Sequence, residues 1–521
     1  MKNSKPTNET EYLLGIDMGT ASSKGVLATA SGAIVATASI KHAVSLPRPG
    51  WAEVDAEEVW WADVVSLCRE LTTAAAGGRV AGVCVSGVGP CLLLCDAQDR
   101  PLRPAILYGI DMRASAEITE LTERYGAERI IERGGTALSS QAVGPKMLWV
   151  RRNEPEVWDQ AVRWYNSSSY IVARLTGSYT LDHHTASQCD PLYYIRDRQW
   201  CEDWVQDIAP SLQFPELVLP SDVVGTLQAD AAMATGLPEG TPVCAGTVDA
   251  WAEAFSAGVR RPGDLMLMYG STMFFVQVLP NLRSHPLLWT TAGIDAGSYT
   301  LAAGMATSGI LTEWVQKLTG DVPFPRLVAE AAATPPGADG LVVLPYFAGE
   351  RTPIFDPQAR GVVAGLSLKH GRGHLLRGVY EGIACGVRQI LELLDAVGGP
   401  AKRIVAVGGG TQSRLWTQIV SDVTGREQML PAETIGASYG DALLAAIGIG
   451  LVPEETDWAR PESAVVADPA NSELYDDLYE TYCSLYPATR SVVHRLAIVQ
   501  QTSPGSPNER MSDRSCISSV K

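Results

Sequence analysis

An acid, a small hydroxyl-rich turn and a lysine follow one another in residues 15–24. Asp17 ends an apolar run, and a carboxylate in that place can hold a hydrated Mg²⁺ ion. The turn after it offers backbone N–H groups and hydroxyls to phosphate oxygens, and Lys24 adds a positive charge. The hydroxyls belong to Thr20, Ser22 and Ser23. An ordinary hairpin loop explains the segment less well, because the acid, the hydroxyls and the lysine coincide in this order.

Two further small turns could close around a nucleotide. Ser271 and Thr272 belong to a Gly-Ser-Thr turn, which alone is equally well explained as an ordinary turn. Three consecutive glycines at 408–410 follow an apolar run and precede a helix that we expect from about Ser413. Glycines there let the backbone approach a phosphate or a flat ring closely, so this segment favours nucleotide binding over a simple helix cap.

Asp249 lies where a short apolar strand at 242–245 ends and an apolar helix begins. An Asp at this point is most often a helix N-cap. It could also act as a general base, because a hydroxyl that attacks a γ-phosphoryl group needs an acceptor for its proton. The local pattern favours neither interpretation.

Polar residues also follow two other apolar runs. Asp111 comes after residues 105–108, and a substrate-binding role is open for it. Glu350 and Arg351 come after residues 341–347, and for this pair we expect a salt-bridged structural role.

An α/β framework is needed to bring these residues together. The strands expected in the first half run over residues 12–17, 24–30 and 33–40, and those in the second half over 264–269, 273–278 and 403–407. A strand follows the Asp17 loop, whereas a P-loop or a dinucleotide-binding fold would place a helix there. Each half shows a strand, a Gly/Ser/Thr turn and a second strand, which indicates two related α/β domains around a cleft, joined near 250–260.

Length and composition narrow the class of protein. The 521 residues predict two or three domains, and the net charge of -17 argues against a nucleic-acid or acidic-membrane partner. No run of about 18 apolar residues predicts a membrane helix. The N-terminus lacks the apolar core of a signal peptide, and the ten Cys form no C-x-x-C pair, so we expect a cytoplasmic enzyme.

These segments together resemble the FGGY carbohydrate kinases over about residues 12–487. The resemblance is strongest at residues 15–24, 246–249 and 407–413, and it continues to Gln418 and Asp422. Residues 50–55 resemble the xylulokinase branch of the family. Both signature regions of the family are present, with Val143 and Gly378 as departures from the usual residue types.

The resemblance implies an α/β fold of two actin-like (ribonuclease H-like) domains around a central cleft. Residues 12–256 would form the sugar- and phosphate-binding domain, and residues 257–490 the nucleotide-binding domain. Residues 1–11 and 491–521 are polar and are expected to be disordered.

The resemblance also implies roles for single residues. Asp249 would be the catalytic base, and Asp17 would organise Mg²⁺ through water. Residues near the β- and γ-phosphates would be Thr20, Ser22, Ser23, Lys24, Ser271 and Thr272, and those lining the adenosine site Gly309, Gly409, Gly410 and Ser413. The sugar would lie against Gly89, Pro90, Asp111 and Asp249.

The implied activity is Mg²⁺- and ATP-dependent phosphorylation of a hydroxyl of a small sugar or polyol, with the ketopentose D-xylulose as the leading substrate. Xylulokinases carry a Met-His pair that contacts the sugar, and this chain has Gly89 and Pro90 there. D-Ribulose, erythritol-type polyols, gluconate and an autoinducer-type diketone hydrate therefore stay open as substrates.

Other classes are an actin- or chaperone-like ATPase that binds a protein and a degenerate kinase that serves as a sensor. Asp249 and the lack of a peptide-binding domain after about residue 490 argue against the first, and the intact Asp17, Lys24 and Asp249 against the second. Beyond ATP and a small sugar or polyol, we expect no nucleic-acid or membrane partner, and formation of a homodimer stays open.

Overall fold

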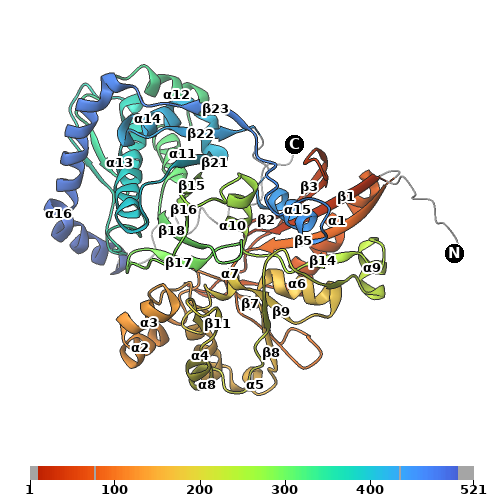
Figure 1. Ribbon diagram of the computed structural model, residues 1–521. Coiled ribbons are helices and arrows are strands. Elements are labelled where there is room, and N and C mark those ends of the chain that lie inside the picture. The colour runs from red at the N-terminus through yellow and green to blue at the C-terminus, as the bar shows by residue number, and fades with distance from the viewer. Residues whose placement is uncertain (1–9, 76–77, 433–435, 503–521) are drawn as a thin grey trace.

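Two mixed β-sheets form the centre of the molecule (Figure 1). The computed structural model describes residues 10–75, 78–432 and 436–502. The N-terminal sheet has the order β13 (Val223–Thr226), β14 (Pro242–Cys244), β5 (Gly78–Gly87), β1 (Thr10–Met18), β2 (Ser22–Thr29) and β3 (Ile34–Lys41). Its central strand β1 is buried from Leu13 to its end, which explains why this segment is an apolar run rather than an alternating one.

The C-terminal sheet repeats this arrangement and adds one strand. Its order is β17 (Trp289–Ala292), β18 (Tyr299–Met305), β16 (Met273–Leu279), β15 (Asp264–Tyr269), β21 (Arg403–Val407), β22 (Gln428–Pro431) and β23 (Pro461–Val465). In each sheet a central strand runs antiparallel to the next strand in sequence and parallel to a later one: β1 with β2 and β5, β15 with β16 and β21. The expectation of two related α/β domains is confirmed.

Helices cover the sheets, and most of the short elements between β5 and β13 form a lobe below them, which we call the lower lobe (Figure 1). The N-terminal half contains η1 (Ala56–Trp61), a π-helix that continues into α1 (Ala62–Ala74), then α2 (Ser115–Tyr125), α3 (Ala127–Gly134), α4 (Val143–Asn153), α5 (Pro155–Trp158), α6 (Ser167–Thr176), α7 (His183–Ala186), α8 (Glu202–Ile208), α9 (Ala229–Thr235) and α10 (Asp249–Ser256). The C-terminal half contains α11 (Gly309–Leu318), α12 (Phe324–Ala332), α13 (Arg372–Gly398), the 3₁₀ turn η2 (Gly409–Gln412), α14 (Arg414–Thr424), α15 (Ala437–Gly448), the 3₁₀ turn η3 (Pro469–Asn471) and α16 (Ser472–Thr502). Short strand pairs complete both halves: β4 (Glu53–Val54) with β7 (Ala105–Ile106), β6 (Leu93–Cys95) with β8 (Arg163–Tyr165), β9 (Thr180–Asp182) with β12 (Glu216–Val218), β10 (Tyr193–Tyr194) with β11 (Gln199–Trp200), and β19 (Val342–Leu344) with β20 (Val362–Ala364).

Helices α10 and α15 lie between the two sheets and pack against each other. α10 buries Trp251 against strands of the C-terminal sheet, whereas α15 packs on β1 and β5 of the N-terminal sheet. Small residues allow these close approaches: a Cβ on Gly440 would lie 2.1 Å from the Ala252 carbonyl oxygen, and one on Gly15 would lie 1.9 Å from that of Ser438. The end of β1 and the start of α10 therefore meet at the base of the cleft.

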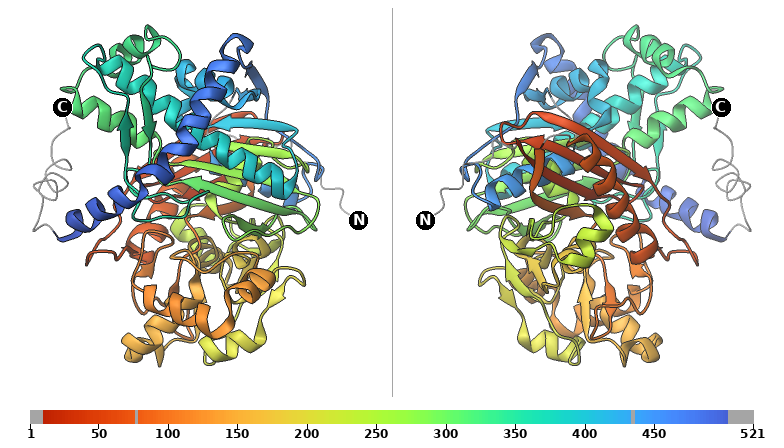
Figure 2. Two further views of the ribbon diagram at one scale, coloured as in Figure 1. Left: turned by 90° about the vertical axis from the view of Figure 1, so that its left-hand side faces the viewer. Right: turned by 90° about the vertical axis from the view of Figure 1, so that its right-hand side faces the viewer.

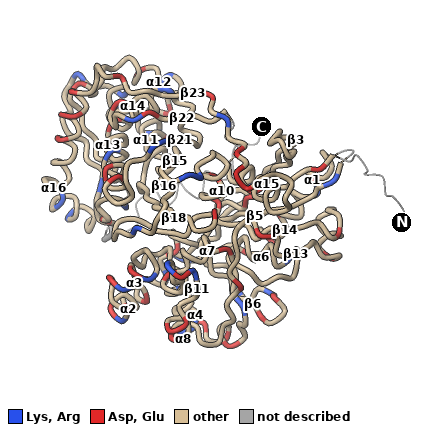
Figure 3. The backbone as a smooth tube through the Cα atoms, in the orientation of Figure 1, with Lys and Arg blue, Asp and Glu red and all other residues tan. Residues whose placement is uncertain are grey.

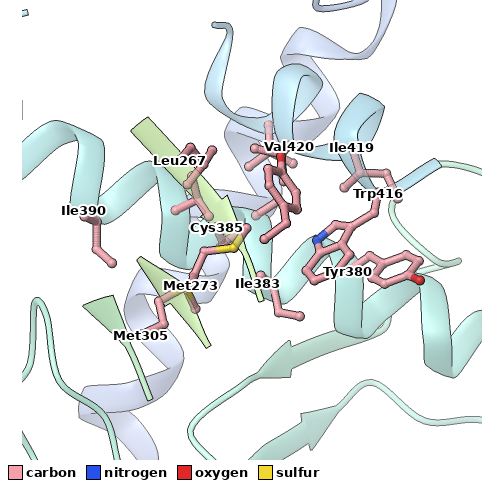
Figure 4. Packing of buried hydrophobic residues seen from close by; sticks show 14 of the residues in the cluster. Leu267, Met273, Met305, Tyr380, Ile383, Cys385, Ile390, Trp416, Ile419 and Val420 are labelled. Carbon is pink, nitrogen blue, oxygen red and sulfur yellow. The ribbon is translucent and has the colours of Figure 1, made fainter. Parts of the chain in front are cut away.

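The core of the C-terminal domain forms around α13 (Figure 4). Side chains of α13, including Ile383 and Ile390, pack against Leu267 and Met305 of the sheet and against Val420 of α14. Full burial of each such side chain contributes about 1.5–3 kcal/mol. This packing gives the C-terminal side of the cleft a rigid base.

The chain ends differ from the expectation of disorder at residues 1–11 and 491–521. β1 already includes residues 10 and 11, and α16 continues to Thr502 across the outside of the C-terminal domain (Figure 2). Val493 and Ala497 are buried, and the Nε2 atom of His494 lies 2.6 Å from the Asp356 carboxylate. The prediction is wrong for 491–502 because apolar residues on one face of this polar segment dock on the domain. Residues 1–9 and 503–521 lie outside the described part of the chain.

Acidic and basic side chains are interspersed over both halves (Figure 3). Within residues 10–75, 78–432 and 436–502, no helix combines the length and apolar character needed to cross a membrane.

Candidate active site

A cavity of about 580 Å³ lies between the two sheets at the ends of β1 and α10. We call it the central cavity; the residues of its lining that the predictions named are Asp17, Thr20, Ser22, Lys24, Gly89, Asp249, Ser271 and Thr272. These residues come from both halves of the chain. The structure therefore brings together most of the residues that the sequence singled out for phosphate and substrate.

Strand geometry decides which residues of the first loop reach this cavity. Asp17 pairs with Lys24 in the antiparallel β1–β2 ladder, and Ser22 and Lys24 both line the cavity. Ser23 points to the opposite face, because successive side chains of a strand alternate. It is fully buried, and its Oγ donates a hydrogen bond of 2.7 Å to the Asp63 carboxylate. The side chain of Ser23 therefore does not line the central cavity, which corrects its predicted place near the β- and γ-phosphates.

The carboxylate of Asp17 is buried, and its Oδ1 has no hydrogen-bond partner among the described residues. Burial raises its pKa well above the usual range, as does the charge of Asp249, while Lys24 acts in the opposite direction. Beside it, the Ser86 hydroxyl donates a 2.6 Å hydrogen bond to Asp441 of α15, a contact that spans the two halves of the chain. A buried oxygen without a partner costs free energy, so the position suits a carboxylate that awaits a cation or its hydration shell.

Asp249 is the first residue of α10, and Val248 occupies the N-cap position. The Oδ1 atom of Asp249 accepts a hydrogen bond of 2.7 Å from the N–H of the next residue, Ala250. Among the described residues, this carboxylate accepts no N–H group from further along α10. Burial raises the pKa of Asp249 to about 7, and the nearby Glu253 adds to the rise, whereas the Ala250 N–H and Lys24 lower it. A carboxylate with such a pKa, open to the cavity, is suited to general-base chemistry near neutral pH.

Aromatic rings and further polar side chains complete the lining of the central cavity. The rings belong to Tyr108, Trp251, Phe274 and Trp289, and the other polar side chains to Gln141, Gln188, Asp190 and Arg351. Sequence reasoning missed these residues, with the exception of Arg351. Only Trp251 carried a signal, since it follows Asp249 in the first turn of the predicted helix.

Two hydrogen bonds link the lower lobe to the C-terminal sheet beside the central cavity. The Thr290 N–H donates to the Thr136 hydroxyl at 3.0 Å, and the Ala292 N–H donates to the Ser187 hydroxyl at 3.0 Å. Thr136 and Ser187 also line the cavity. An acceptor molecule in this cavity would therefore lie between residues of both domains.

Three further predictions about this region need correction. Asp111 does not line the cavity: its carboxylate is buried, accepts the Ala52 N–H at 2.7 Å and pairs with Arg113 at 2.7 Å. Pro90 does not line it either, and only Gly89 of that turn does. The expected salt bridge of Glu350 and Arg351 is absent from the described residues.

Glu350 instead orders the backbone that carries Arg351. Its Oε1 accepts the N–H groups of Ala306, at 2.6 Å, and of Arg351, at 2.7 Å. The Arg351 side chain lines the central cavity. A local apolar run followed by two opposite charges does not reveal such backbone contacts.

A second cavity, of about 630 Å³, lies on the C-terminal domain and is called the outer cavity. Its lining includes all four residues that were predicted for adenosine: Gly309, Gly409, Gly410 and Ser413. Tyr380 and Trp416 form an aromatic wall, with ring centroids 5.1 Å apart and planes at 11°. The buried Nε1 of Trp416 has no hydrogen-bond partner among the described residues.

Ser271 lines both cavities, so they meet at the turn between β15 and β16. Gly309 packs directly on this turn: its N–H donates to the Gly270 carbonyl at 3.0 Å, and a Cβ there would lie 2.5 Å from the same oxygen. Gly409 has open space where a Cβ would stand. A nucleotide with its base in the outer cavity could reach the central cavity with its phosphates past Ser271.

Magnesium would need few protein ligands here. The described residues hold no group of three or more His, Cys, Asp or Glu that could bind a metal ion by themselves. The buried, unpartnered oxygen of Asp17 fits an ion that takes its other ligands from water and phosphate oxygens, as Mg²⁺ commonly does. The two cavities together can accommodate a nucleoside triphosphate and a small acceptor, with the Asp249 carboxylate beside the acceptor as a general base.

Comparisons with known proteins agree with this arrangement. The N-terminal domain model of the FGGY family of carbohydrate kinases matches residues 12–256, and the C-terminal domain model of that family matches residues 265–449. Xylulose kinase of Escherichia coli (strain K12) is 31% identical over 487 residues, which cover 91% of this chain and 98% of that protein. Xylulose kinase of Lactococcus lactis is 28% identical over 496 residues, which cover 93% of this chain and 98% of that protein.

Solved structures show the same fold. The crystal structure of xylulose kinase from Rhodospirillum rubrum has a TM-score of 0.86 and 35% identity, covering 93% of this chain and all of that one. The fold class predicted from the sequence, two actin-like domains around a central cleft, is thereby confirmed. The chain belongs to the FGGY family of carbohydrate kinases.

Proposed function

We propose that this carbohydrate kinase transfers the γ-phosphoryl group of ATP to a hydroxyl of D-xylulose, with Asp249 as the base. The observation that carries the proposal is the placement of Asp249, Asp17 and Lys24 in one cavity that meets the nucleotide-sized outer cavity at Ser271. The xylulose kinases among the relatives support the choice of acceptor.

Asp249 orients the attacking hydroxyl and accepts its proton. Its raised pKa makes it a stronger base than an exposed carboxylate, while the Ala250 N–H keeps one oxygen fixed in place. Proton acceptance by a positioned group contributes about 10²–10⁴-fold to a rate. The hydroxyl therefore has to lie between Asp249 and the phosphate loops.

The phosphate groups lie against Thr20, Ser22, Lys24, Ser271 and Thr272. The Lys24 amine and the backbone N–H groups of the two turns stabilise negative charge on the transferring group. Asp17 would hold Mg²⁺ through water, and the ion would neutralise further negative charge on the phosphates. The adenosine lies in the outer cavity against the wall of Tyr380 and Trp416.

Enclosure by both domains limits transfer of the phosphoryl group to water. The lower lobe meets the C-terminal sheet through the Thr136–Thr290 and Ser187–Ala292 contacts, and these cover the acceptor.

We also propose a cytoplasmic location, which the nine free cysteines of the described residues support.

The test is release of ADP by the purified protein with Mg²⁺-ATP and one acceptor at a time. The panel is D-xylulose, D-ribulose, erythritol, D-gluconate and an autoinducer-type diketone hydrate, so that it covers each substrate class that the sequence leaves open. We expect the highest kcat/KM with D-xylulose. A higher kcat/KM with another member would overturn the choice of acceptor, and ADP release that no acceptor stimulates would overturn the kinase assignment itself.

A further inference from the structure

Asp190 is a buried carboxyl group of the central cavity that the mechanism does not use. It follows α7 in the lower lobe, lines the cavity and is only 5% exposed. Its side chain forms no ion pair or hydrogen bond with the described part of the chain, and its Oδ1 is enclosed without a partner. The backbone of Gly134 lies against this oxygen, since a Cβ on that glycine would be 2.3 Å from it.

A structural role does not explain this side chain. The backbone of Asp190 does contribute to the fold, because its carbonyl accepts the Gly144 N–H at 3.0 Å. Any residue type could supply that carbonyl. A buried carboxyl group without a partner lowers the stability of the folded protein, and such groups are concentrated at functional sites.

Two amide side chains face the same space. Gln141 and Gln188 both line the central cavity, and Gln188 is held by a contact of 2.8 Å between its Nε2 and the Nε2 of His184. The amides and the carboxyl group thus offer donors and acceptors in a cavity that the rings of Trp251 and Trp289 also line. This combination suits a polyhydroxylated chain, whose apolar C–H face packs on rings while its hydroxyls find polar partners.

We propose that Asp190 hydrogen-bonds a hydroxyl of the acceptor remote from the one that is phosphorylated, and thereby determines which polyol or ketose the kinase accepts. This inference rests on the proposed function, since it assumes that the acceptor occupies the central cavity. Asp190 would thus supply a polar contact to the acceptor in a cavity where Gly89 offers no side-chain donor.

The protonation state of Asp190 agrees with this role. Burial raises the pKa of Asp190 well above the usual range of a carboxyl group, which favours its protonated form. A protonated carboxyl group can donate and accept at once, as the hydroxyl of a sugar does. It also does not repel the phosphates of the nucleotide.

The experiment compares wild type with Asp190→Ala, Asp190→Asn and Gly134→Ala. In Gly134→Ala the new Cβ would lie 2.3 Å from Oδ1 of Asp190, so this variant should displace the carboxyl group without removing it. We expect Asp190→Ala to raise the KM for D-xylulose by roughly 10- to 100-fold and to leave the KM for ATP unchanged. Asp190→Asn keeps a donor and an acceptor in the same place, so its KM should rise less.

Deoxy analogues of D-xylulose, each lacking one hydroxyl, identify the partner of Asp190. One analogue should be a much poorer substrate than D-xylulose for wild type and a nearly equal one for Asp190→Ala. Gly134→Ala should raise the KM as well, and Gly134→Ala combined with Asp190→Ala should be no worse than Asp190→Ala alone. Thermal unfolding of Asp190→Asn at or above the wild-type temperature would show that the carboxyl group is not needed for folding.

A KM for D-xylulose within twofold of wild type in Asp190→Ala, or the same penalty for every deoxy analogue in both proteins, would overturn the proposal. If wild type prefers another member of the acceptor panel, the proposed substrate is wrong, and the same variants are compared on that acceptor. The two failures are therefore distinguishable.

Discussion

Replacement of Asp249 by Asn tests the assignment of the base. Asn has the same shape, and its side-chain oxygen can still accept the Ala250 N–H that now lies 2.7 Å from Oδ1. The start of α10 should therefore keep its structure, while the group that accepts the proton is lost. A general base contributes about 10²–10⁴-fold, so we expect kcat to fall by that factor, a loss of about 3–5 kcal/mol of transition-state stabilisation.

The binding of ATP should be little changed in Asp249→Asn. Asp249 does not line the outer cavity, where the nucleotide base and ribose are expected to lie. Steady-state release of ADP with varied ATP and varied D-xylulose gives both KM values and kcat. Nucleotide binding measured by calorimetry gives an independent value for the variant even when its turnover is too slow to follow.

Glu253→Gln is the matched control. Glu253 lies one turn further along α10, lines the same cavity and also has a carboxyl group whose pKa is raised by burial. Removal of its charge should reduce kcat far less than Asp249→Asn does. The reasoning is refuted if Asp249→Asn retains more than about a tenth of the wild-type kcat, below the range for a general base, or if both variants lose the same factor.

Three further predictions follow from the site and the core. Activity should fall as the pH drops through about 7, because the base must be ionised and burial raises the pKa of Asp249 to that range; Glu253→Gln should move this fall to lower pH, as a pH profile of kcat/KM would show. Gly309→Ala should raise the KM for ATP more than that for D-xylulose, because its Cβ would displace the Gly270 carbonyl beside the Ser271 turn; equal effects on both substrates would count against the assignment of the outer cavity. Ile383→Ala should lower the free energy of unfolding by about 2–5 kcal/mol, measured in urea, because this fully buried side chain lies in the C-terminal core; a change below about 1 kcal/mol would contradict the packing described.

The sequence predicted the framework of the site well because its signals are local. Strand, turn and strand follow one another around Asp17 and around Ser271, and glycines mark the turn at 408–410. The β1–β2 and β15–β16 pairs form as expected. These elements need only neighbouring residues to specify them.

Contacts between distant parts of the chain could not be predicted in this way. Asp441 of α15 accepts a hydrogen bond from Ser86 of β5, and no pattern in either segment indicates the other. The Asp111 carboxylate accepts the N–H of the distant Ala52, whereas Arg351 reaches the cavity that was expected to hold Asp111. Ser23 was misassigned for a simpler reason, since alternation along β2 could have excluded it.

The acceptor side of the cavity is the least predictable part. Gln188 and Asp190 come from the lower lobe, and Trp289 comes from β17 of the C-terminal sheet. They meet because a loop after α7 and the strand β17, which are far apart in the chain, converge on one cavity. In the function proposed above, these residues bind the acceptor, and the motifs that indicate the kinase chemistry do not include them.

The most direct test of the central claim follows the phosphoryl group itself. The protein is incubated with Mg²⁺ and ATP labelled at the γ-phosphate, with and without D-xylulose, and the products are separated and identified by mass spectrometry. The account predicts that the label moves to a D-xylulose phosphate in an amount equal to the ADP formed, and that Asp249→Asn forms little of this product. Label found only in inorganic phosphate, whether or not D-xylulose is present, would contradict the account.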